Sequence, residues 1–289
     1  MICVLYNPQA SNGRGAEKAE ALRPLLSEGE IAFHNVLEIE DLPAFLEALA
    51  PQDKVYLAGG DGTLNKFINL LGDHTVKNEL YLYGSGSGND FLRDVLGKDQ
   101  AGPVQINRYI DDLPCVTVNG RTQRFINGIG FGIDGYCCEV GDKKRAKKPG
   151  KAVNYTAIAI TGLLFHFRAP NARITVDGES KEYRRAWIAP AMKGRFYGGG
   201  MMVAPAQDRL AEDGKLSSVV FYGKGRLKTL MAFPSIFEGK HIEHPDMVDI
   251  RRGHTITVEF DRPTALQIDG ETVLGVTSYT VCAKVPAKV

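Results

Sequence analysis

Short apolar runs that end in turn-forming residues organise the first part of the chain. Each run has four or five mostly apolar residues and stops at asparagine or glycine, which is typical of a buried strand. Three runs have this form, at residues 2–6, 54–58 and 80–83. Patterns of helical period follow the first two, at 16–26 and 64–71. Strands that alternate with helices predict an α/β domain with a Rossmann-like parallel sheet over residues 1–112.

The pattern changes near residue 112, where helical periods give way to shorter apolar runs separated by turns. Such runs lie at residues 115–118, 172–176, 216–222, 255–260 and 279–285. Strands at this density predict a β-rich, sandwich-like second domain over residues 113–282. Asp111-Asp112-Leu113-Pro114 is the expected boundary between the two domains.

The turns that follow the first three strands are rich in glycine and small polar residues. They read Asn7-Pro8 with Ser11-Asn12-Gly13-Arg14-Gly15, then GGDGTLN at 59–65, then GSGSGNDF at 84–91. The carboxyl ends of parallel strands share one edge, so these loops are expected to converge on one crevice. Glycine lets the backbone approach a ligand and take positive φ, and a helix N-terminus favours negative charge, which together predict a phosphate site at 59–65. The alternative is a tight turn in which Asp61 or Thr63 caps the following helix.

Other nucleotide and catalytic motifs are absent or incomplete. No Walker A pattern, G-x-x-x-x-G-K-[ST], occurs, so the usual P-loop lysine is missing. Gly130, Gly132 and Gly135 satisfy the dinucleotide expression, but no suitable acidic residue closes a βαβ unit about 20 residues later. His241 and His244 lack a third defined metal ligand, and no G-x-S-x-G nucleophile elbow is present.

The composition is that of a folded protein without a strong charge bias. The 289 residues include 35 Lys or Arg and 34 Asp or Glu, so no general attraction to nucleic acid is expected. An apolar run of about 18 residues and a signal peptide are both absent, which favours a cytoplasmic chain that does not span a membrane. Five cysteines without a C-x-x-C pair are expected to stay reduced. The oligomeric state stays open, a homodimer included.

In their order and approximate spacing, these motifs resemble the diacylglycerol kinase catalytic domain family, the lipid kinases that include bacterial diacylglycerol kinases and sphingosine kinases. The matching stretches are Asn7-Pro8, GGDGTLN at 59–65, GSGNDF at 86–91, Asn127-Gly128 with GFGID at 130–134, GGG at 198–200 through DGKL at 213–216, and DGE at 269–271. GGDGT alone is shared with NAD kinases and phosphofructokinases, whereas the ordered set is more specific. Lys66 stands where the family usually has Glu, and Ser87 stands where Thr is common.

The resemblance implies an ATP-dependent lipid kinase that phosphorylates the hydroxyl of diacylglycerol or a similar lipid, giving phosphatidic acid or its analogue. The implied nucleotide-binding residues are Asn7, Pro8, Ser11, Gly59, Gly60, Asp61, Gly62, Thr63, Asn65, Ser87, Asn89, Asp90 and Asp134. The family architecture also implies that residues 283–289 return to the first domain. Two other functions stay open, an NAD kinase-like or other small-molecule kinase of the same superfamily and, because of Lys66, a nucleotide-binding regulator without catalysis.

The resemblance also implies the catalytic carboxylates. Glu271 would accept the proton of the lipid hydroxyl, with Asp61 and Asp269 as further catalytic residues. Without the resemblance, Asp-Gly between two apolar runs is a common hairpin turn, and Glu271 would be a solvated residue beside it.

A separate Mg²⁺ site is implied by the bacterial members of the family. Asp213 would bind through its carboxylate, and Leu210 and Lys215 through their backbone carbonyls, because oxygen ligands suit magnesium. The local alternative is an ordinary turn at Asp213-Gly214.

A lipid substrate implies contact with a membrane surface. A basic run, Lys143, Lys144, Arg145, Lys147, Lys148 and Lys151, directly precedes an apolar pattern at 153–165. Basic residues beside an apolar helix suit anionic lipids, at about 1 kcal/mol for each cation near such a surface. Peripheral contact with the inner membrane face is therefore expected, and a solvated loop before a core helix is the alternative.

Overall fold

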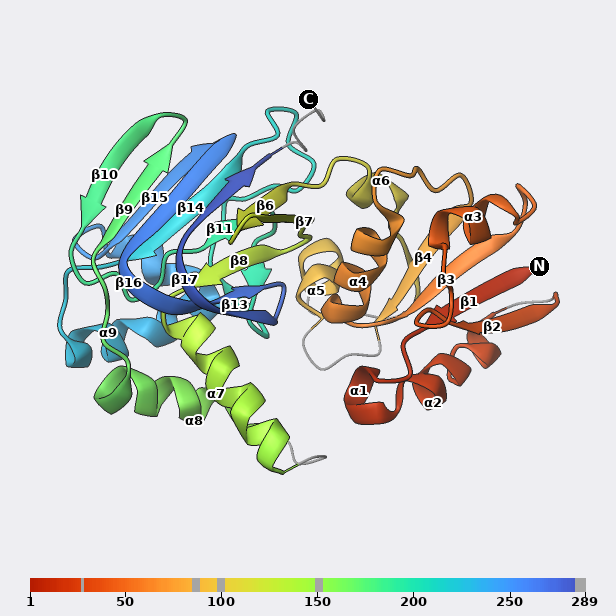
Figure 1. Cartoon of the computed structure of the whole chain (residues 1–289), viewed down its shortest axis with the longest axis horizontal. Coiled ribbons are helices and arrows are strands. Elements are labelled where there is room, and N and C mark those ends of the chain that lie inside the picture. The colour runs from red at the N-terminus through yellow and green to blue at the C-terminus, as the bar shows by residue number, and fades with distance from the viewer. Residues whose placement is uncertain (27–28, 85–88, 98–101, 149–152, 284–289) are drawn as a thin grey trace. The chain divides into compact units, whose positions relative to one another are not determined.

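The computed structural model describes residues 1–26, 29–84, 89–97, 102–148 and 153–283. The chain divides into two compact units, Met1–Leu113 and Pro114–Val289 (Figure 1). The division falls within the segment 111–114. None of the helices in these described ranges is long and apolar enough to cross a bilayer.

The first unit is an α/β domain built on a five-stranded sheet with the order β2-β1-β3-β4-β5. Its strands are β1 (Ile2–Tyr6), β2 (Ile31–Asn35), β3 (Lys54–Gly59), β4 (Glu79–Gly84) and β5 (Val104–Gln105). The first four run parallel and β5 runs antiparallel to β4, which confirms the predicted parallel sheet. The strand order reverses at β1, where β2 and β3 lie on opposite sides. Doubly wound sheets bind ligands at such a switch point, outside the carboxyl ends of the strands.

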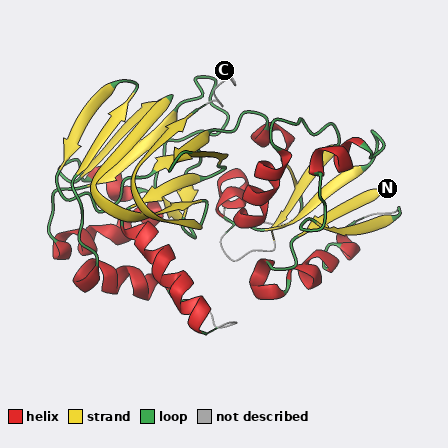
Figure 2. Ribbon diagram, viewed as in Figure 1, coloured by secondary structure: helices red, strands yellow, loops and turns green. Residues whose placement is uncertain are grey.

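Helices of the first unit lie on both faces of this sheet (Figure 2). They are α1 (Ala10–Gly13), α2 (Gly15–Glu20), the 3₁₀ turn η1 (Arg23–Leu25), α3 (Leu42–Glu47), α4 (Asp61–Leu71), α5 (Asp90–Leu96) and α6 (Asn107–Ile110). The helix predicted over 16–26 is interrupted after Glu20, and Pro24 lies in the 3₁₀ turn that follows. Helix α4 starts three residues before its apolar period, because the Gly60 carbonyl accepts the N–H groups of Thr63 and Leu64.

The second unit is an antiparallel, β-rich domain, as predicted. Its main sheet has the strand order β15-β14-β11-β8-β16-β17-β6-β7, with β9 pairing β16 and β10 pairing β9. These strands are β6 (Cys115–Val118), β7 (Arg121–Arg124), β8 (Gly128–Phe131), β9 (Ala172–Val176), β10 (Glu179–Tyr183), β11 (Ala191–Met192), β14 (Leu216–Phe221), β15 (Val248–Gly253), β16 (Thr255–Ile268) and β17 (Glu271–Cys282). A small separate ribbon pairs β12 (Phe196–Tyr197) with β13 (Met201–Met202).

The long strand β16 joins two parts of the sheet. Its first half pairs with β9 and its last three residues pair with β8. The register against β17 shifts between Glu259 and Thr264, where Pro263 cannot donate a ladder hydrogen bond. The apolar runs at 255–260 and 265–268, which look separate in the sequence, are therefore one bent strand.

Two apolar cores hold the second unit together. One is formed by inward residues of β6, β8, β9, β14, β16 and β17, including Phe131, Leu266 and Tyr279. The other lies between the sheet and a helical layer, with Leu163 and Trp187 among its buried residues. The layer consists of α7 (Ile133–Lys147), α8 (Tyr155–Thr161), the π-helical turn η2 (Gly162–His166), α9 (Arg226–Ala232) and the 3₁₀ segments η3 (Phe233–Glu238) and η4 (Lys240–Glu243).

The expected return of residues 283–289 to the first domain falls mostly outside the described residues. Ala283 is described, and it is buried in the first of these two cores, with its N–H donating to the carbonyl of His254.

Candidate functional site

Three loops of the first unit leave the sheet at one edge. The parallel register places Tyr6 opposite Ala58, and Gly59 opposite Gly84. Asn7-Pro8, the Gly60 turn and the chain after Gly84 therefore start from the ends of three neighbouring strands, as the pattern predicted. Ser87, one of the predicted nucleotide-binding residues, lies outside the described ranges.

The Asp61 carboxylate joins two of these loops. Its Oδ2 accepts the N–H of Asp90 at 2.8 Å, and its Oδ1 accepts the N–H of Phe91 at 3.0 Å. These donors are the first backbone amides of α5, whose positive dipole end favours a carboxylate. Asp61 therefore caps a helix, but that helix is α5. The alternative interpretation had expected Asp61 to cap α4. The contact fixes the start of α5 against the second loop, and the predicted contacts of Asp61 with metal or nucleotide stay predictions.

Glycine is required in these loops mainly for close approach. A β-carbon on Gly59 would collide with the side chain of buried Thr63, and one on Gly15 would collide with the carbonyl of Asn7. Gly60 has φ −106° and ψ −164°, an extended conformation open to any residue, so the expectation of positive φ is wrong there. Positive φ occurs instead at Ser11 and Asn89, in the first and third loops.

Two further polar residues of the first unit have local partners. Asn7 Oδ1 accepts the N–H of Gln9 at 3.0 Å, which shapes the turn after β1. Asn65 is buried, and its carbonyl accepts Nδ2 of Asn69 at 2.9 Å. Lys66 is exposed on α4. Asn7 and Asn65 thus stabilise the first loop and α4 locally, whereas Lys66 is exposed to solvent.

In the second unit, Asp269 organises the hairpin that carries Glu271. Its carboxylate accepts three backbone N–H groups, from Ile126 at 2.6 Å, Asn127 at 2.9 Å and Gly128 at 3.0 Å. Asp269 itself has φ +46° and is almost fully buried. Both oxygens of this carboxylate accept hydrogen bonds from the backbone and so stabilise the fold. The geometry therefore assigns Asp269 a positioning role.

Glu271 is the first residue of β17 and is exposed, next to this anchored turn. Thr272 ties the same strand to α7, because its hydroxyl donates to Asp142 Oδ2 at 2.6 Å. A solvent-accessible carboxylate on a braced hairpin can receive a proton from a bound hydroxyl. The role of Glu271 as proton acceptor stays a prediction.

Asp134 lies in α7 close to the same hairpin. Its Oδ2 accepts the Tyr197 hydroxyl at 2.7 Å, while its buried Oδ1 has no hydrogen-bond partner in the described part of the chain. A β-carbon on Gly130 would collide with this carboxylate and lie 2.5 Å from Gln267 Nε2. Gln267 also accepts the Gly270 N–H at 2.6 Å, so its amide lies between Asp134 and the hairpin turn. Burial raises the pKa of Asp134 to about 6, against the lowering influence of the Tyr197 hydroxyl and nearby backbone amides.

This raised pKa gives a pH-dependent stability. The folded protein binds the Asp134 proton more tightly than the unfolded chain, so the stabilisation is complete below pH 3.8 and is lost as pH rises through about 6. The shift corresponds to about 3 kcal/mol. Asp134→Asn is expected to remove this loss. The free energy of unfolding of the variant, relative to that of the parent, should therefore rise by about 3 kcal/mol between pH 4 and 7.5. Urea unfolding across this range measures it, and parallel pH profiles would show that Asp134 titrates normally.

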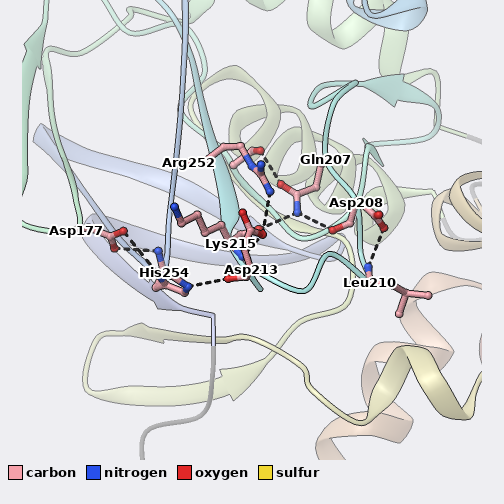
Figure 3. A network of polar contacts seen from close by, with 9 residues as sticks. Asp177, Gln207, Asp208, Leu210, Asp213, Lys215, Arg252 and His254 are labelled. Carbon is pink, nitrogen blue, oxygen red and sulfur yellow. Dashed lines mark hydrogen bonds and ion pairs between the residues drawn. The ribbon is translucent and has the colours of Figure 1, made fainter.

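The segment 207–215 forms a loop with its own polar network (Figure 3). Asp208 Oδ1 accepts the Leu210 N–H at 2.9 Å, and Gln207 Nε2 donates to the Lys215 carbonyl at 2.9 Å. Asp213 Oδ1 accepts its own loop's Lys215 N–H and the guanidinium of Arg252, each at 3.2 Å. The residues that the sequence assigned to Mg²⁺ therefore lie in one loop.

These oxygens do not fit a bound Mg²⁺ as they are arranged. The Asp213 carboxylate meets a guanidinium, and the Lys215 carbonyl already has a donor. His254 Nε2 also bonds the Asp213 carbonyl at 2.8 Å, so cationic and N–H groups surround the turn (Figure 3). Magnesium requires several oxygens directed at one point. The Mg²⁺ site stays a prediction that this arrangement does not support.

The pairing of Asp213 with Arg252 predicts how Mg²⁺ affects the thermal unfolding of the protein. Adding Mg²⁺ to protein treated with EDTA should leave Tm unchanged, because Arg252 takes the place of a cation at Asp213. Arg252→Met should lower Tm by about 2 °C or less, since both partners of the pair are partly exposed. A rise in the parent's Tm with Mg²⁺ that Asp213→Asn abolishes would show that a cation binds at this loop.

Polar residues that the sequence interpretation missed connect these parts of the second unit. Arg209 is buried and donates to the Ile126 carbonyl and the Asn127 side chain, next to the amides that Asp269 holds. The loop 207–215 and the Glu271 hairpin are therefore linked through residues 126–128. Tyr197 and Gln267 were also missed, although Tyr197 directly precedes the glycine triplet and Gln267 lies two residues before Asp269.

The glycines of the dinucleotide-like motif have packing roles. Gly132 has φ +123°, and a β-carbon there would collide with the Trp187 carbonyl. Gly135 approaches the Ala265 carbonyl in the same way, and β8 before it pairs antiparallel with β11 and β16. His241 is a core residue that contacts the Val203 carbonyl at 2.9 Å and stacks on Phe221. Burial lowers the pKa of His241.

Comparison with known proteins agrees with this geometry. A protein named diacylglycerol kinase from Mycobacterium tuberculosis is 28% identical over 269 residues, which cover 89% of this chain and 84% of that protein. "Probable lipid kinase YegS-like" of Klebsiella pneumoniae is 29% identical over 280 residues, covering 92% and 89%. The crystal structure of a diacylglycerol kinase from Bacillus anthracis has the same fold, with a TM-score of 0.57 at 17% identity and coverage of 100% of this chain and 98% of that one.

Family assignments cover nearly the whole chain in two parts. Residues 1–114 match the diacylglycerol kinase catalytic domain. Residues 127–288, more than half of the chain, match the YegS C-terminal NAD kinase beta sandwich-like domain. The chain therefore belongs to the lipid kinase family that combines a diacylglycerol kinase catalytic domain with a YegS-type C-terminal domain.

Proposed function

We propose that this chain is an ATP-dependent lipid kinase that transfers the γ-phosphate of ATP, bound as its magnesium complex, to the hydroxyl of diacylglycerol or a similar lipid. The product is phosphatidic acid or its analogue. The observation that carries the proposal is the convergence of three loops at one edge of the parallel sheet, in a chain whose first 114 residues match the diacylglycerol kinase catalytic domain.

The first unit holds the nucleotide in this proposal. The N-terminus of α4, an 11-residue helix, carries Gly60 and Gly62 and faces phosphate with its positive dipole end. The equivalent end of α5 is already occupied by Asp61, so α4 is the better phosphate site. Asn7 directly follows β1, which pairs with β3, and Asn89 directly precedes Asp90, whose N–H donates to Asp61.

The second unit supplies the groups that act on the acceptor hydroxyl. Phosphoryl transfer to an alcohol leaves a proton, and Glu271 receives it. Asp269 fixes the turn before Glu271. Gln267 accepts the Gly270 N–H of that turn, and its amide and the Asp134 carboxylate both lie close to Gly130. The partner is a lipid at a membrane surface, and the site of action is the cytoplasmic side of the inner membrane.

Release of ADP with different acceptors tests the proposal. Purified protein with ATP and Mg²⁺ is expected to release ADP faster when diacylglycerol is added, and not when a sphingoid base or NAD is added. Stimulation by NAD alone would identify a nucleotide kinase of the same superfamily. ATP binding without stimulation by any of the three acceptors would support a regulator without catalysis.

A further inference from the structure

The helical layer of the second unit exposes large apolar side chains. Met231 is 76% exposed, Phe165 70% and Leu227 68%, the highest values for large hydrophobic residues in the described ranges, and Ile160 is 43% exposed. Isolated exposed hydrophobics are common, but a cluster indicates an interaction surface. These four residues are called the apolar patch below.

The members of the apolar patch lie on adjoining elements. Arg226, at the start of α9, donates to the Leu163 carbonyl of η2 at 2.6 Å, which fixes the two elements side by side. Leu227 and Met231 are one turn apart on α9 and so share a face. Ile160 lies on α8, which continues directly into η2 with Phe165. Figure 1 shows α8 and α9 together on one side of the sheet.

The same helices bury a different set of side chains. Ile158, Leu163 and Leu230 pack into the core beneath the helical layer. Each element is thus apolar on its inner side, as folding requires, and keeps further apolar residues outside. The apolar patch is additional to what the core needs.

Cations predominate in one stretch of sequence beside the apolar patch. Residues 143–168 contain seven Lys or Arg and no Asp or Glu. Arg145 lies over the ring of Tyr155 at 6.0 Å, so the basic end of α7 adjoins the start of α8. Some cations of the helical layer have acidic partners. Lys143 pairs with Glu139 and Arg145 with Asp142 on α7, and Lys224 and Lys228 both pair with Asp246. Lys144, Lys147, Lys148 and Arg168 are exposed in the same basic stretch.

We propose that the apolar patch inserts into the surface of an anionic bilayer, with the basic end of α7 and Arg168 against the lipid headgroups. Apolar side chains bordered by cations combine insertion with attraction to anionic lipid. A second copy of the chain fits less well, because it would bring two basic surfaces together. The proposal rests on the proposed function, since the lipid acceptor resides in that bilayer.

Sedimentation with vesicles tests the surface. The probes are vesicles of phosphatidylcholine alone and vesicles with one third phosphatidylglycerol. The Phe165→Ser/Met231→Ser double variant is expected to bind the anionic vesicles more weakly than the parent, with an affinity lower by about 10-fold or more. Leu25→Ser is the matched control, because Leu25 is 54% exposed but lies on η1 of the first unit, outside the helical layer, and its binding should match the parent's. Equal binding by the double variant and the parent, with equal Tm, would overturn the proposal.

Two further readouts separate this proposal from the function. The double variant is expected to keep parental turnover of a water-soluble short-chain diacylglycerol, because the patch meets the membrane and not the reacting groups. If the parent phosphorylates no acceptor but its patch still governs vesicle binding, the function fails and the surface stands. If the double variant changes the sedimentation coefficient of the free protein while vesicle binding is unaffected, the patch joins two copies of the chain and the membrane proposal fails.

Discussion

Glu271→Gln is expected to lower kcat by about 10²-fold or more while ATP affinity changes little. Glutamine preserves the size and hydrogen-bonding capacity of the side chain but cannot accept the proton that the lipid hydroxyl releases. Glu271 is exposed on a hairpin that Asp269 anchors, so the substitution should leave the fold intact. Single-turnover kinetics measure the chemical step directly.

Glu259→Gln is a matched control for this substitution. Glu259 is an exposed glutamate of β16, the other strand of the same hairpin, and it lies far along that strand from the turn. Its replacement should leave kcat at the parental value. Near-parental turnover by Glu271→Gln would move the base elsewhere, with Asp134 the first candidate, because its Oδ1 is uncommitted in the described structure whereas both oxygens of Asp269 hold backbone amides.

Gly60→Val is expected to weaken ATP binding by about 10-fold or more, as a side chain intrudes where the backbone meets phosphate. The extended φ and ψ of Gly60 are compatible with valine, so the loss should come from the ligand and not from backbone strain. Isothermal titration with a non-hydrolysable ATP analogue measures the affinity.

Gly225→Val controls for the effect of valine at such a position. Gly225 also precedes a helix in an extended conformation, with φ −76° and ψ 166°, and open space surrounds its missing β-carbon. That variant should bind ATP as the parent does. Unchanged affinity in a folded Gly60→Val protein would remove the 59–65 loop from the nucleotide site.

The sequence predicts the fold well where burial is local and continuous. Strands β1, β6 and β9 have the bounds that their apolar runs indicate, because every second or nearly every residue of such a run is buried. It fails where a contact from elsewhere sets the boundary. The bend of β16 depends on pairing with two different strands, β9 and β8. The local sequence of β16 does not indicate which strands it pairs with.

The candidate site was predictable as a set of loops but not as a set of contacts. Asp61 is recognisable as a helix-capping type, yet its amide partners lie 29 and 30 residues later, at α5. The Tyr197 partner of Asp134 is 63 residues away. Arg252, which pairs with Asp213 in the predicted metal loop, comes from β15 and has no local motif. Such pairings are set by the tertiary fold, so spacing rules cannot show them.

Transfer of labelled γ-phosphate from ATP to diacylglycerol is the decisive test of lipid kinase activity. The lipid is presented in mixed micelles with Mg²⁺, and the extracted product is identified by its mass. We expect one labelled phosphate on each product molecule, formed by the parent and strongly reduced in Glu271→Gln and Gly60→Val. Label that stays in ATP or appears only as inorganic phosphate, with a folded parent protein, would contradict it.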